Sequence, residues 1–406
     1  MIPFSPPRID DKIIAEVTAA LKSGWITTGP RTKRFEKELA FYCGISNVIC
    51  LNSATAGLEI MLRWFGVGEG DEVIVPAYTY SATANVVMHC GAKPVLAEAG
   101  YDFNISPAVL KSLITTKTKV IMPVDIGGLP CNYAAIYKVI TDPEVKAFFK
   151  PANKKQEELG RILILSDAAH SFGGTFENKK SGSCADASAF SFHAVKNLTT
   201  AEGGAVALNL PNPFDNKAIY DYLCIYTLHG QNKDALAKMQ IGNWKYDIIE
   251  AGYKCNMPDI QAAIGLVELS RYDSETLPRR KNICELYSEY FKIFDWAELP
   301  IFNHVDYVAE SSYHLYQLRI KNITENQRDQ ILQLIFNKEV SVNVHFIPLP
   351  LLTYYKNKGY KMEDYPIAYD NYSREISLPV FFDLTNDMIT EVCKAVSDSV
   401  TVILNN

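Results

Sequence analysis

Short, continuously hydrophobic runs alternate with longer amphipathic segments over the first two-thirds of the chain. The clearest runs lie at residues 48–51, 73–75, 120–122, 162–165 and 205–208. Runs without polar alternation are typical of strands whose two faces are both covered by helices. The pattern therefore predicts an α/β architecture with a mostly parallel sheet between helices.

Helices are predicted between these runs, at residues 54–65, 79–90, 106–115 and 258–269. The last segment has the strongest helical signature, because apolar residues recur there at helical spacing and Pro258 fits a first helical turn. The residues that share its apolar face are Ile260, Ala263, Ile264 and Val267.

A change in composition divides the chain into two predicted domains. The segment 271–281 is polar and contains Pro278, which favours a domain boundary at that point. We assign residues 1–270 to a large α/β domain with an N-terminal arm and residues 271–406 to a smaller α+β domain. The charged segment 141–160 interrupts the alternation of elements and is predicted to be a surface insertion.

The smaller domain carries weaker patterns. They predict strands at 312–320 and 340–347, helices at 324–337 and 385–399, and a loop over the tyrosine-rich segment 351–372.

Composition narrows the class of protein. Hydrophobic residues make up 48% of the 406 positions, which excludes a disordered chain. The chain has 40 basic and 46 acidic residues, so it lacks the excess of positive charge that is typical of nucleic-acid-binding proteins. No apolar stretch approaches the roughly 18 residues of a membrane-spanning helix. Nine scattered cysteines without zinc-binding spacing indicate reduced thiols and no metal site. We expect a cytoplasmic protein without nucleic-acid or membrane partners.

Small residues follow the first hydrophobic run, at 52–57, and lead into a predicted helix. Ligands of open α/β sheets bind beyond the carboxyl ends of the strands. Small side chains at a helix N-terminus leave N–H groups open to a phosphate. Taken alone, the segment also fits an ordinary N-cap, and that interpretation stays open at this point.

Two charged residues follow other strands. Asp167 comes after the run 162–165, where a buried acid needs a cationic partner, although it also fits a capping or turn residue. Lys196 follows the apolar stretch 187–192, where desolvation can make an amine nucleophilic, although most lysines are solvated surface charges. One cofactor, pyridoxal phosphate (PLP), explains all three features, because it needs a phosphate site, a partner for its ring nitrogen and an imine-forming amine.

Over essentially its whole length the sequence also resembles the DegT-type, PLP-dependent nucleotide-sugar aminotransferases of fold type I. The resemblance is specific because several short motifs occur in the family's order. They are SGWITTGP at 23–30, NSATAGL at 52–58, GDEVIVP at 70–76, DAAH at 167–170, SFHAVKN at 191–197, EGG at 202–204 and MPDIQAAIG at 257–265.

The resemblance implies roles for individual residues. Lys196 would bind the cofactor as an imine and then act as general acid and base, and Asp167 would pair with the pyridine nitrogen. His170 occupies the position beside the ring hydroxyl. Tyr80 matches the aromatic residue that stacks on the ring, although it also fits a core tyrosine.

Other residues are implied to hold the phosphate: Ala54, Thr55 and Ser191. The loop 252–257 is implied to reach a partner subunit's phosphate in a homodimer with shared active sites. Lys254 and Asn256 differ there from the commonest family residues, and Lys254 keeps a phosphate donor. His314 and Tyr316 match a family motif without an assigned contact.

The leading hypothesis is therefore amino transfer, with glutamate as the donor, to a nucleotide-linked keto-deoxysugar in cell-surface polysaccharide or glycan biosynthesis. His170 and the turn 199–204 favour amination at C4 of a UDP- or GDP-linked 4-keto-6-deoxyhexose, with C3 as the alternative. A sugar dehydratase of the same fold would carry His at the position of Lys196, and a non-catalytic regulator would not need the Lys196 and Asp167 pair.

Overall fold

A computed structural model describes residues 1–232, 245–304 and 306–405. Its central sheet has seven strands in the order β1-β9-β8-β5-β4-β2-β3. Only β9 runs antiparallel to its neighbours, and the remaining adjacent strands pair in parallel. The strands are β1 (Asn47–Leu51), β2 (Glu72–Pro76), β3 (Lys93–Ala97), β4 (Thr118–Ile121), β5 (Leu163–Asp167), β8 (Ala187–Ser191) and β9 (Gly204–Leu208).

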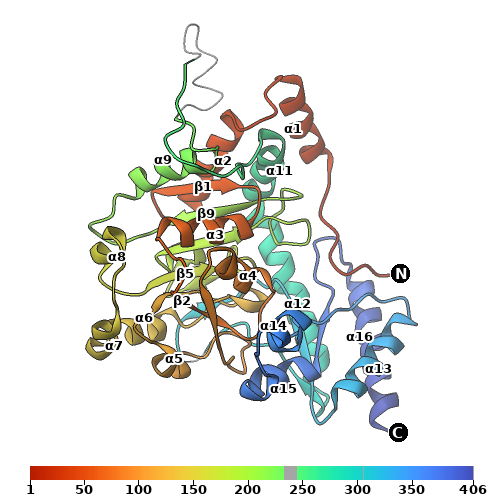
Figure 1. The fold of residues 1–406 in the computed structure, drawn as a ribbon. Helices are drawn as coiled ribbons and strands as arrows, with labels where there is room; N and C mark the ends of the chain where they lie inside the picture. Colours follow the sequence, from red (N-terminus) through yellow and green to blue (C-terminus); the bar gives the residue numbers. More distant parts are fainter. Residues whose placement is uncertain (233–244, 305, 406) are drawn as a thin grey trace.

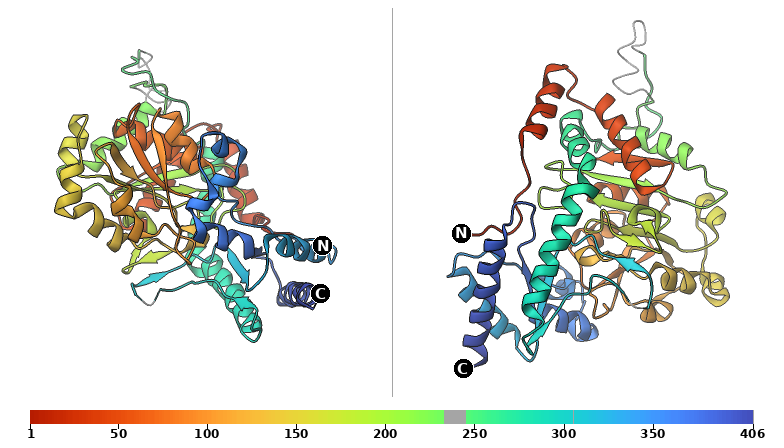
Figure 2. Two further views of the ribbon diagram at one scale, coloured as in Figure 1. Left: turned by 60° about the horizontal axis from the view of Figure 1, so that its bottom comes forward. Right: turned by 180° about the vertical axis from the view of Figure 1, so that it is seen from behind.

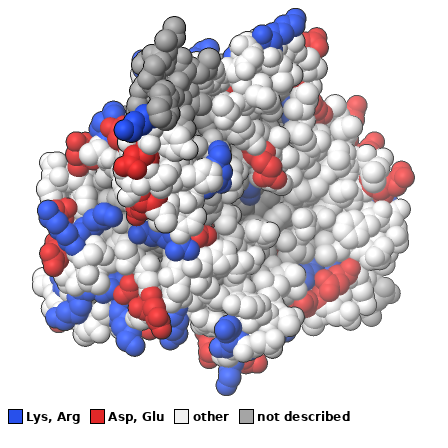
Figure 3. Space-filling view, turned by 45° about the horizontal axis from the view of Figure 1, so that its top comes forward, with Lys and Arg blue, Asp and Glu red and all other residues white. Residues whose placement is uncertain are grey.

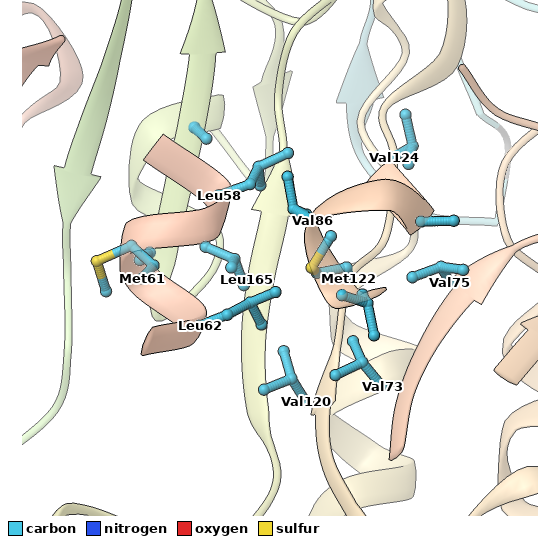
Figure 4. Close-up of a cluster of buried hydrophobic side chains, with 14 of the residues drawn as sticks. Leu58, Met61, Leu62, Val73, Val75, Val86, Val120, Met122, Val124 and Leu165 are labelled. Carbon is cyan, nitrogen blue, oxygen red and sulfur yellow. The ribbon is translucent and has the colours of Figure 1, made fainter. Parts of the chain in front are cut away.

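Helices cover both faces of this sheet, as the uninterrupted hydrophobic runs predict. Val73 and Val75 pack in one cluster with Leu58 (Figure 4), whereas Ile74 between them packs in another with Leu110. The helices of the first cluster are α3 (Ala54–Trp64), α4 (Ala82–His89) and α9 (Asn216–Tyr226), and those of the second are α5 (Pro107–Leu113), α6 (Tyr133–Thr141) and α7 (Pro143–Phe148). The α/β class is confirmed.

A third cluster joins β1 to α2 (Pro30–Cys43) and α11 (Asp259–Ser270). The helix expected from residue 258 is present, but Pro258 is its N-cap and not its first helical residue. A π-helical turn, η3 (Tyr272–Thr276), then leads directly into α12 (Leu277–Phe291), so residues 272–281 are helical.

The smaller sheet has the order β10-β12-β13, with β10 (Ala297–Glu298), β12 (Tyr316–Ile320) and β13 (Glu375–Leu378). It packs against α12, α13 (Glu325–Phe336) and α16 (Asn386–Leu404) in a separate hydrophobic cluster (Figure 1, lower right). This cluster takes its buried residues from Ile2 and from residues beyond 282. The domain boundary at 270/271 stays a prediction.

The remaining elements are short or peripheral. They are α1 (Asp11–Lys22), η1 (Ile126–Gly128), α8 (Lys154–Leu159), β6 (Thr175–Phe176), β7 (Lys179–Lys180), η2 (Ser181–Ser183), β11 (Ala309–Glu310), η4 (Leu349–Leu351), α14 (Thr353–Asn357), η5 (Met362–Asp364) and α15 (Pro366–Arg374). The segment 141–160 thus contains all of α7 and all of α8.

Two predictions for the smaller domain are wrong. Residues 340–347 make only isolated bridges, from Val340 to Ile2 and from Asn343 to Ser377, so they form no strand. The tyrosine-rich segment 351–372 is helical and not a loop. Its Tyr355 and Tyr372 are buried against the core of the large domain, and this tertiary packing outweighs the weak local pattern.

An N-terminal arm, residues 1–10, links the two parts of the molecule. It runs from α1 to the smaller domain (Figure 2, right), where Ile2 exchanges backbone hydrogen bonds with Glu339 and Ser341. Arg8 holds the arm to the helical connection through an ion pair with Glu275 at 2.7 Å.

All nine cysteines are free thiols, and eight are buried. On the face shown in Figure 3, Lys and Arg side chains lie among Asp and Glu side chains. Within the described ranges we find no helix with the length and apolar character needed to cross a bilayer.

Candidate active site

A cavity of about 380 Å³ lies beyond the carboxyl ends of the central strands. Its wall combines the start of α3, the segments after β2, β5 and β8, the N-terminal arm and parts of the smaller domain. Most of the residues expected to bind the cofactor meet there. They are Ala54, Thr55, Tyr80, Asp167, His170, Ser191 and Lys196.

Lys196 lies in the turn between the antiparallel strands β8 and β9. Its backbone N–H donates to the His193 carbonyl at 2.9 Å, and the Thr200 N–H closes the turn on the Phe192 carbonyl at 2.8 Å. Burial lowers the pKa of the Lys196 amine to about 8, although the Asp167 charge acts in the opposite direction. About a tenth of this amine is therefore unprotonated and nucleophilic at pH 7, far more than for a lysine with the ordinary pKa.

Asp167 is the last residue of β5 and is buried at the base of the cavity. Its carboxylate accepts hydrogen bonds from the Thr83 hydroxyl at 2.8 Å and from the Ala169 N–H at 3.2 Å. Burial raises the pKa of the Asp167 carboxyl, and these two donors together with the Lys196 charge act against that rise. A cation placed beside Asp167 would favour the ionised carboxylate.

The start of α3 forms the proposed phosphate cradle. Ser53 is the N-cap and accepts from the Ala56 N–H at 3.1 Å. Ala54 and Thr55 open the first turn, whose N–H groups have no acceptor within the helix. A Cβ added to Gly204 would lie 2.4 Å from the Ala54 nitrogen, so a glycine is required where β9 passes this turn. The N-cap and phosphate interpretations are thus compatible.

His170 is buried beside the cavity, and burial holds the pKa of its imidazole well below the ordinary value. The Gly127 N–H donates to its Nδ1 at 3.3 Å, which leaves the proton on Nε2. His314 lies with its ring centroid 4.3 Å from that of His170, and its Nδ1 is 2.8 Å from the Asn197 Oδ1. Tyr316, by contrast, is buried in the smaller domain and does not line the cavity.

Lys254 and Asn256 do not line the cavity. Lys254 is exposed and its Nζ donates to the Asn256 side chain, which in turn donates to the Thr28 hydroxyl. The loop is held against β1 by a bridge between Asn256 and Leu51. Both side chains are therefore placed on the surface beside the SGWITTGP segment.

Several cavity residues were not predicted. One is Phe346, which the smaller domain contributes and whose ring packs 5.8 Å from that of the predicted Tyr80, a side chain that is 63% exposed. Phe4 and Ser5 of the N-terminal arm and His345 also line the wall. The hydrophobic pattern of 340–347 predicts a strand, and nothing in that pattern indicates that its last residues face a cavity.

These residues fit PLP on the chemistry of the donor set. A nucleophilic amine, a buried carboxylate and a helix N-terminus with small residues face one cavity, and each matches one functional group of this cofactor. The fold and the cavity together define a PLP-dependent transferase of fold type I.

Comparisons with known proteins agree. The model of the DegT/DnrJ/EryC1/StrS aminotransferase family matches residues 7–397, and this chain belongs to that family. It is therefore a PLP-dependent sugar aminotransferase.

Similar proteins match over almost their whole length. SpsC of Bacillus subtilis, a spore coat polysaccharide biosynthesis protein, is 36% identical and covers 98% of this chain, and 97% of SpsC is covered in turn. The PMP form of the putative sugar aminotransferase Spr1654 of Streptococcus pneumoniae superimposes with a TM-score of 0.95, 44% identity, and coverage of 99% of this chain and 100% of that one. Helicobacter pylori PseC, an aminotransferase of pseudoaminic acid biosynthesis, gives 0.85 and 27%, with 99% of each chain covered.

Proposed function

We propose that this enzyme transfers an amino group from glutamate to C4 of a nucleotide-linked 4-keto-deoxysugar, in cell-surface polysaccharide or glycan biosynthesis. The observation that carries the proposal is the pairing of Lys196 and Asp167 in one cavity that is also lined by the smaller domain. The roles of SpsC in spore coat polysaccharide biosynthesis and of PseC in pseudoaminic acid biosynthesis support the polysaccharide or glycan setting. The cytoplasmic location stays a prediction.

In this proposal Lys196 and Asp167 are the catalytic residues. Bound PLP supplies a ring that withdraws electrons from the carbon bearing the amine. Lys196 attaches the cofactor and afterwards moves a proton with its Nζ, because its lowered pKa lets it act as both base and acid near neutral pH. Asp167 provides the negative charge that keeps the ring nitrogen protonated, and Thr83 orients that carboxylate.

The remaining residues of the cavity bind and orient. With PLP bound, the Nε2–H of His170 would be the donor available to the ring hydroxyl, and the exposed ring of Tyr80 would supply the stacking surface. Ala54, Thr55 and Ser191 hold the phosphate through the start of α3 and the end of β8.

The working enzyme in this proposal is a homodimer with shared active sites. Lys254 and Asn256 lie on the surface of their own subunit, outside its cavity, where they are free to approach a phosphate bound by the partner. The ammonium group of Lys254 would complete that phosphate site with a positive charge.

A substrate panel tests the reaction. Purified enzyme is incubated with glutamate and UDP-, GDP- or dTDP-linked 4-keto and 3-keto sugars, and products are assigned by NMR from the proton couplings at the amine-bearing carbon. We expect amination at C4 of a UDP- or GDP-linked 4-keto-6-deoxyhexose. An amine on C3 would show that His170 and the turn 199–204 do not govern the position, and no amination of any sugar would refute the proposal.

A further inference from the structure

His345 connects the cavity to a buried carboxyl through one serine. The His345 Nδ1 lies 2.9 Å from the Ser377 Oγ, and that hydroxyl donates to the Glu375 Oε1. The second oxygen, Oε2, accepts from the His345 backbone N–H at 3.0 Å. The three side chains thus form a continuous relay from the cavity wall into the core of the smaller domain.

The imidazole of His345 is fixed in place. Its backbone carbonyl accepts from the Tyr78 hydroxyl and from the Gln317 Nε2, the latter at 2.9 Å. The ring stacks on Phe4 with a centroid distance of 5.4 Å and an interplanar angle of 25°. It lines the cavity, and its Nε2 makes no hydrogen bond to any residue that the structure describes. Nε2 is therefore the ring nitrogen available to a bound substrate.

Glu375 is completely buried and its charge is not neutralised by an ion pair within the described parts of the chain. The two nearby guanidinium groups have other carboxylate partners. Arg319 pairs with Glu298 at 2.6 Å, and Arg328 pairs with Asp329 at 2.7 Å while its Nη1 donates to the Glu375 backbone carbonyl at 3.3 Å.

Burial raises the pKa of the Glu375 carboxyl to about 8, although Ser377, the His345 N–H and the two arginine charges act against the rise. The neighbouring Tyr78 stays neutral, because burial raises the pKa of its phenol well above the ordinary value. Burial also lowers the pKa of His345 to about 3, aided by the charge of Lys196. Across the working pH range Glu375 changes charge while His345 stays neutral.

The relay has two internally consistent arrangements. When Glu375 is ionised, the Ser377 hydroxyl donates a hydrogen bond to it and accepts one from the Nδ1–H of His345. Nε2 then carries no proton and can only accept a hydrogen bond. When the relay takes up one proton, that proton enters from the cavity at Nε2, the Nδ1 proton passes to the Ser377 Oγ, and the Ser377 proton passes to the Glu375 Oε1. Glu375 then donates to Ser377, and Ser377 donates to Nδ1. The number of protons on the ring is unchanged, and Glu375 holds the added proton.

We propose that Glu375 and Ser377 are positioning residues that select which tautomer His345 presents to the substrate. At pH values where Glu375 is ionised, Nε2 accepts a hydrogen bond from a sugar hydroxyl or an ammonium group. At lower pH, where Glu375 is protonated, Nε2 donates a hydrogen bond. The substrate classes named here rest on the proposed function, whereas the tautomer change is a property of the protein itself.

Nitrogen NMR of the holoenzyme tests the tautomer directly. The protein is labelled with ¹⁵N-histidine, and the His345 resonances are identified by their loss in His345→Gln. We expect the protonated ring nitrogen to change from Nε2 at pH 6.5 to Nδ1 at pH 9.5 in the wild-type enzyme. The Glu375→Gln variant removes the titrating group and should give one pH-independent tautomer. The same tautomer at both pH values in the wild type would overturn the proposal.

Serine variants test the link. Ser377→Ala should abolish the pH dependence of the tautomer and lower kcat/KM about fivefold to tenfold, the effect of one lost hydrogen bond. Ser377→Thr, which keeps the hydroxyl, should restore both. The matched control is Ser399→Ala in α16, another buried serine, whose hydroxyl bonds the Ala395 carbonyl. A tautomer change that persists in Ser377→Ala would overturn the relay. If no sugar in the panel is aminated, the proposed function fails, but the NMR experiment still tests the tautomer change.

Discussion

Replacing Asp167 by alanine is the most direct perturbation of the proposed chemistry. The carboxylate is buried at the end of β5, and it is held by Thr83 at 2.8 Å and Ala169 at 3.2 Å. Removing one member of a buried charge pair costs about 3–5 kcal/mol. If this loss falls on the transition state, the rate decreases by about two to four orders of magnitude, because each 1.4 kcal/mol is about tenfold.

The assay compares kcat with cofactor occupancy for Asp167→Ala under saturating PLP. We expect turnover to collapse while the cofactor still binds through Lys196 and the start of α3. Thr83→Val, which removes only the hydroxyl donor, should give a smaller loss of about tenfold.

Asp186→Asn is the matched control. Asp186 is another buried acid beside the same sheet and forms an ion pair with Arg161 at 2.7 Å, away from the cavity. That variant should lower the melting temperature but keep kcat in the folded protein. Near-normal kcat for cofactor-loaded Asp167→Ala would refute the assignment and place the partner of the ring nitrogen elsewhere.

Three further predictions concern Lys196 and the partner subunit. Borohydride reduction of the holoenzyme followed by peptide mapping should place the pyridoxyl group on Lys196, and a label on another lysine would contradict the proposed role. In the cofactor-free enzyme the rate of reaction with added PLP should rise about tenfold per pH unit up to pH 8 and then level off, because only the unprotonated amine attacks and burial lowers the pKa of Lys196 to about 8. A rate that keeps rising to pH 10 would show an ordinary lysine. Mixing Lys196→Ala with the double variant Lys254→Ala and Asn256→Ala should restore about a quarter of wild-type activity, since half of the dimers are hybrids with one intact site of two. A monomer with full activity would exclude shared sites.

The sequence predicted the central sheet well because its strands are buried on both faces. Uninterrupted hydrophobic runs such as 73–75 and 162–165 can bury all of their side chains only between two layers of helices. The structure places them there. Strand β3 went unpredicted because it begins with Lys93 and Pro94. It lies at the edge of the sheet, where a proline is tolerated.

The smaller domain was harder because its segments depend on distant partners. Tyr355 donates to the Asn85 side chain at 2.7 Å, and Tyr360 donates to the Pro94 carbonyl. The helices that contain or flank these residues are fixed against the large domain, and a local pattern cannot register such contacts.

The candidate site likewise contains residues that the sequence predicts and residues that it does not. Asp167 ends β5 and Lys196 lies in the turn after β8, so the rule that ligands bind at the carboxyl ends of strands located both. His345 and Phe4 come from segments about 340 residues apart in the chain. The backbone hydrogen bonds of Ile2 and the stacking of the two rings bring them to the same wall. Thr83 is the second residue of α4, and its hydrogen bond to Asp167 depends on how this helix packs.

The N-terminal arm has a practical consequence for anyone who produces this protein. Phe4 and Ser5 lie in the cavity wall and Ile2 is hydrogen-bonded to the smaller domain, so an affinity tag fused just before Ile2 would adjoin the anchored part of the arm. A bulky tag there would compete with the arm for its place beside the cavity. The end of α16 bears half-exposed and exposed side chains and lies outside the cavity lining, so purification handles and immobilisation linkers are better attached after that helix.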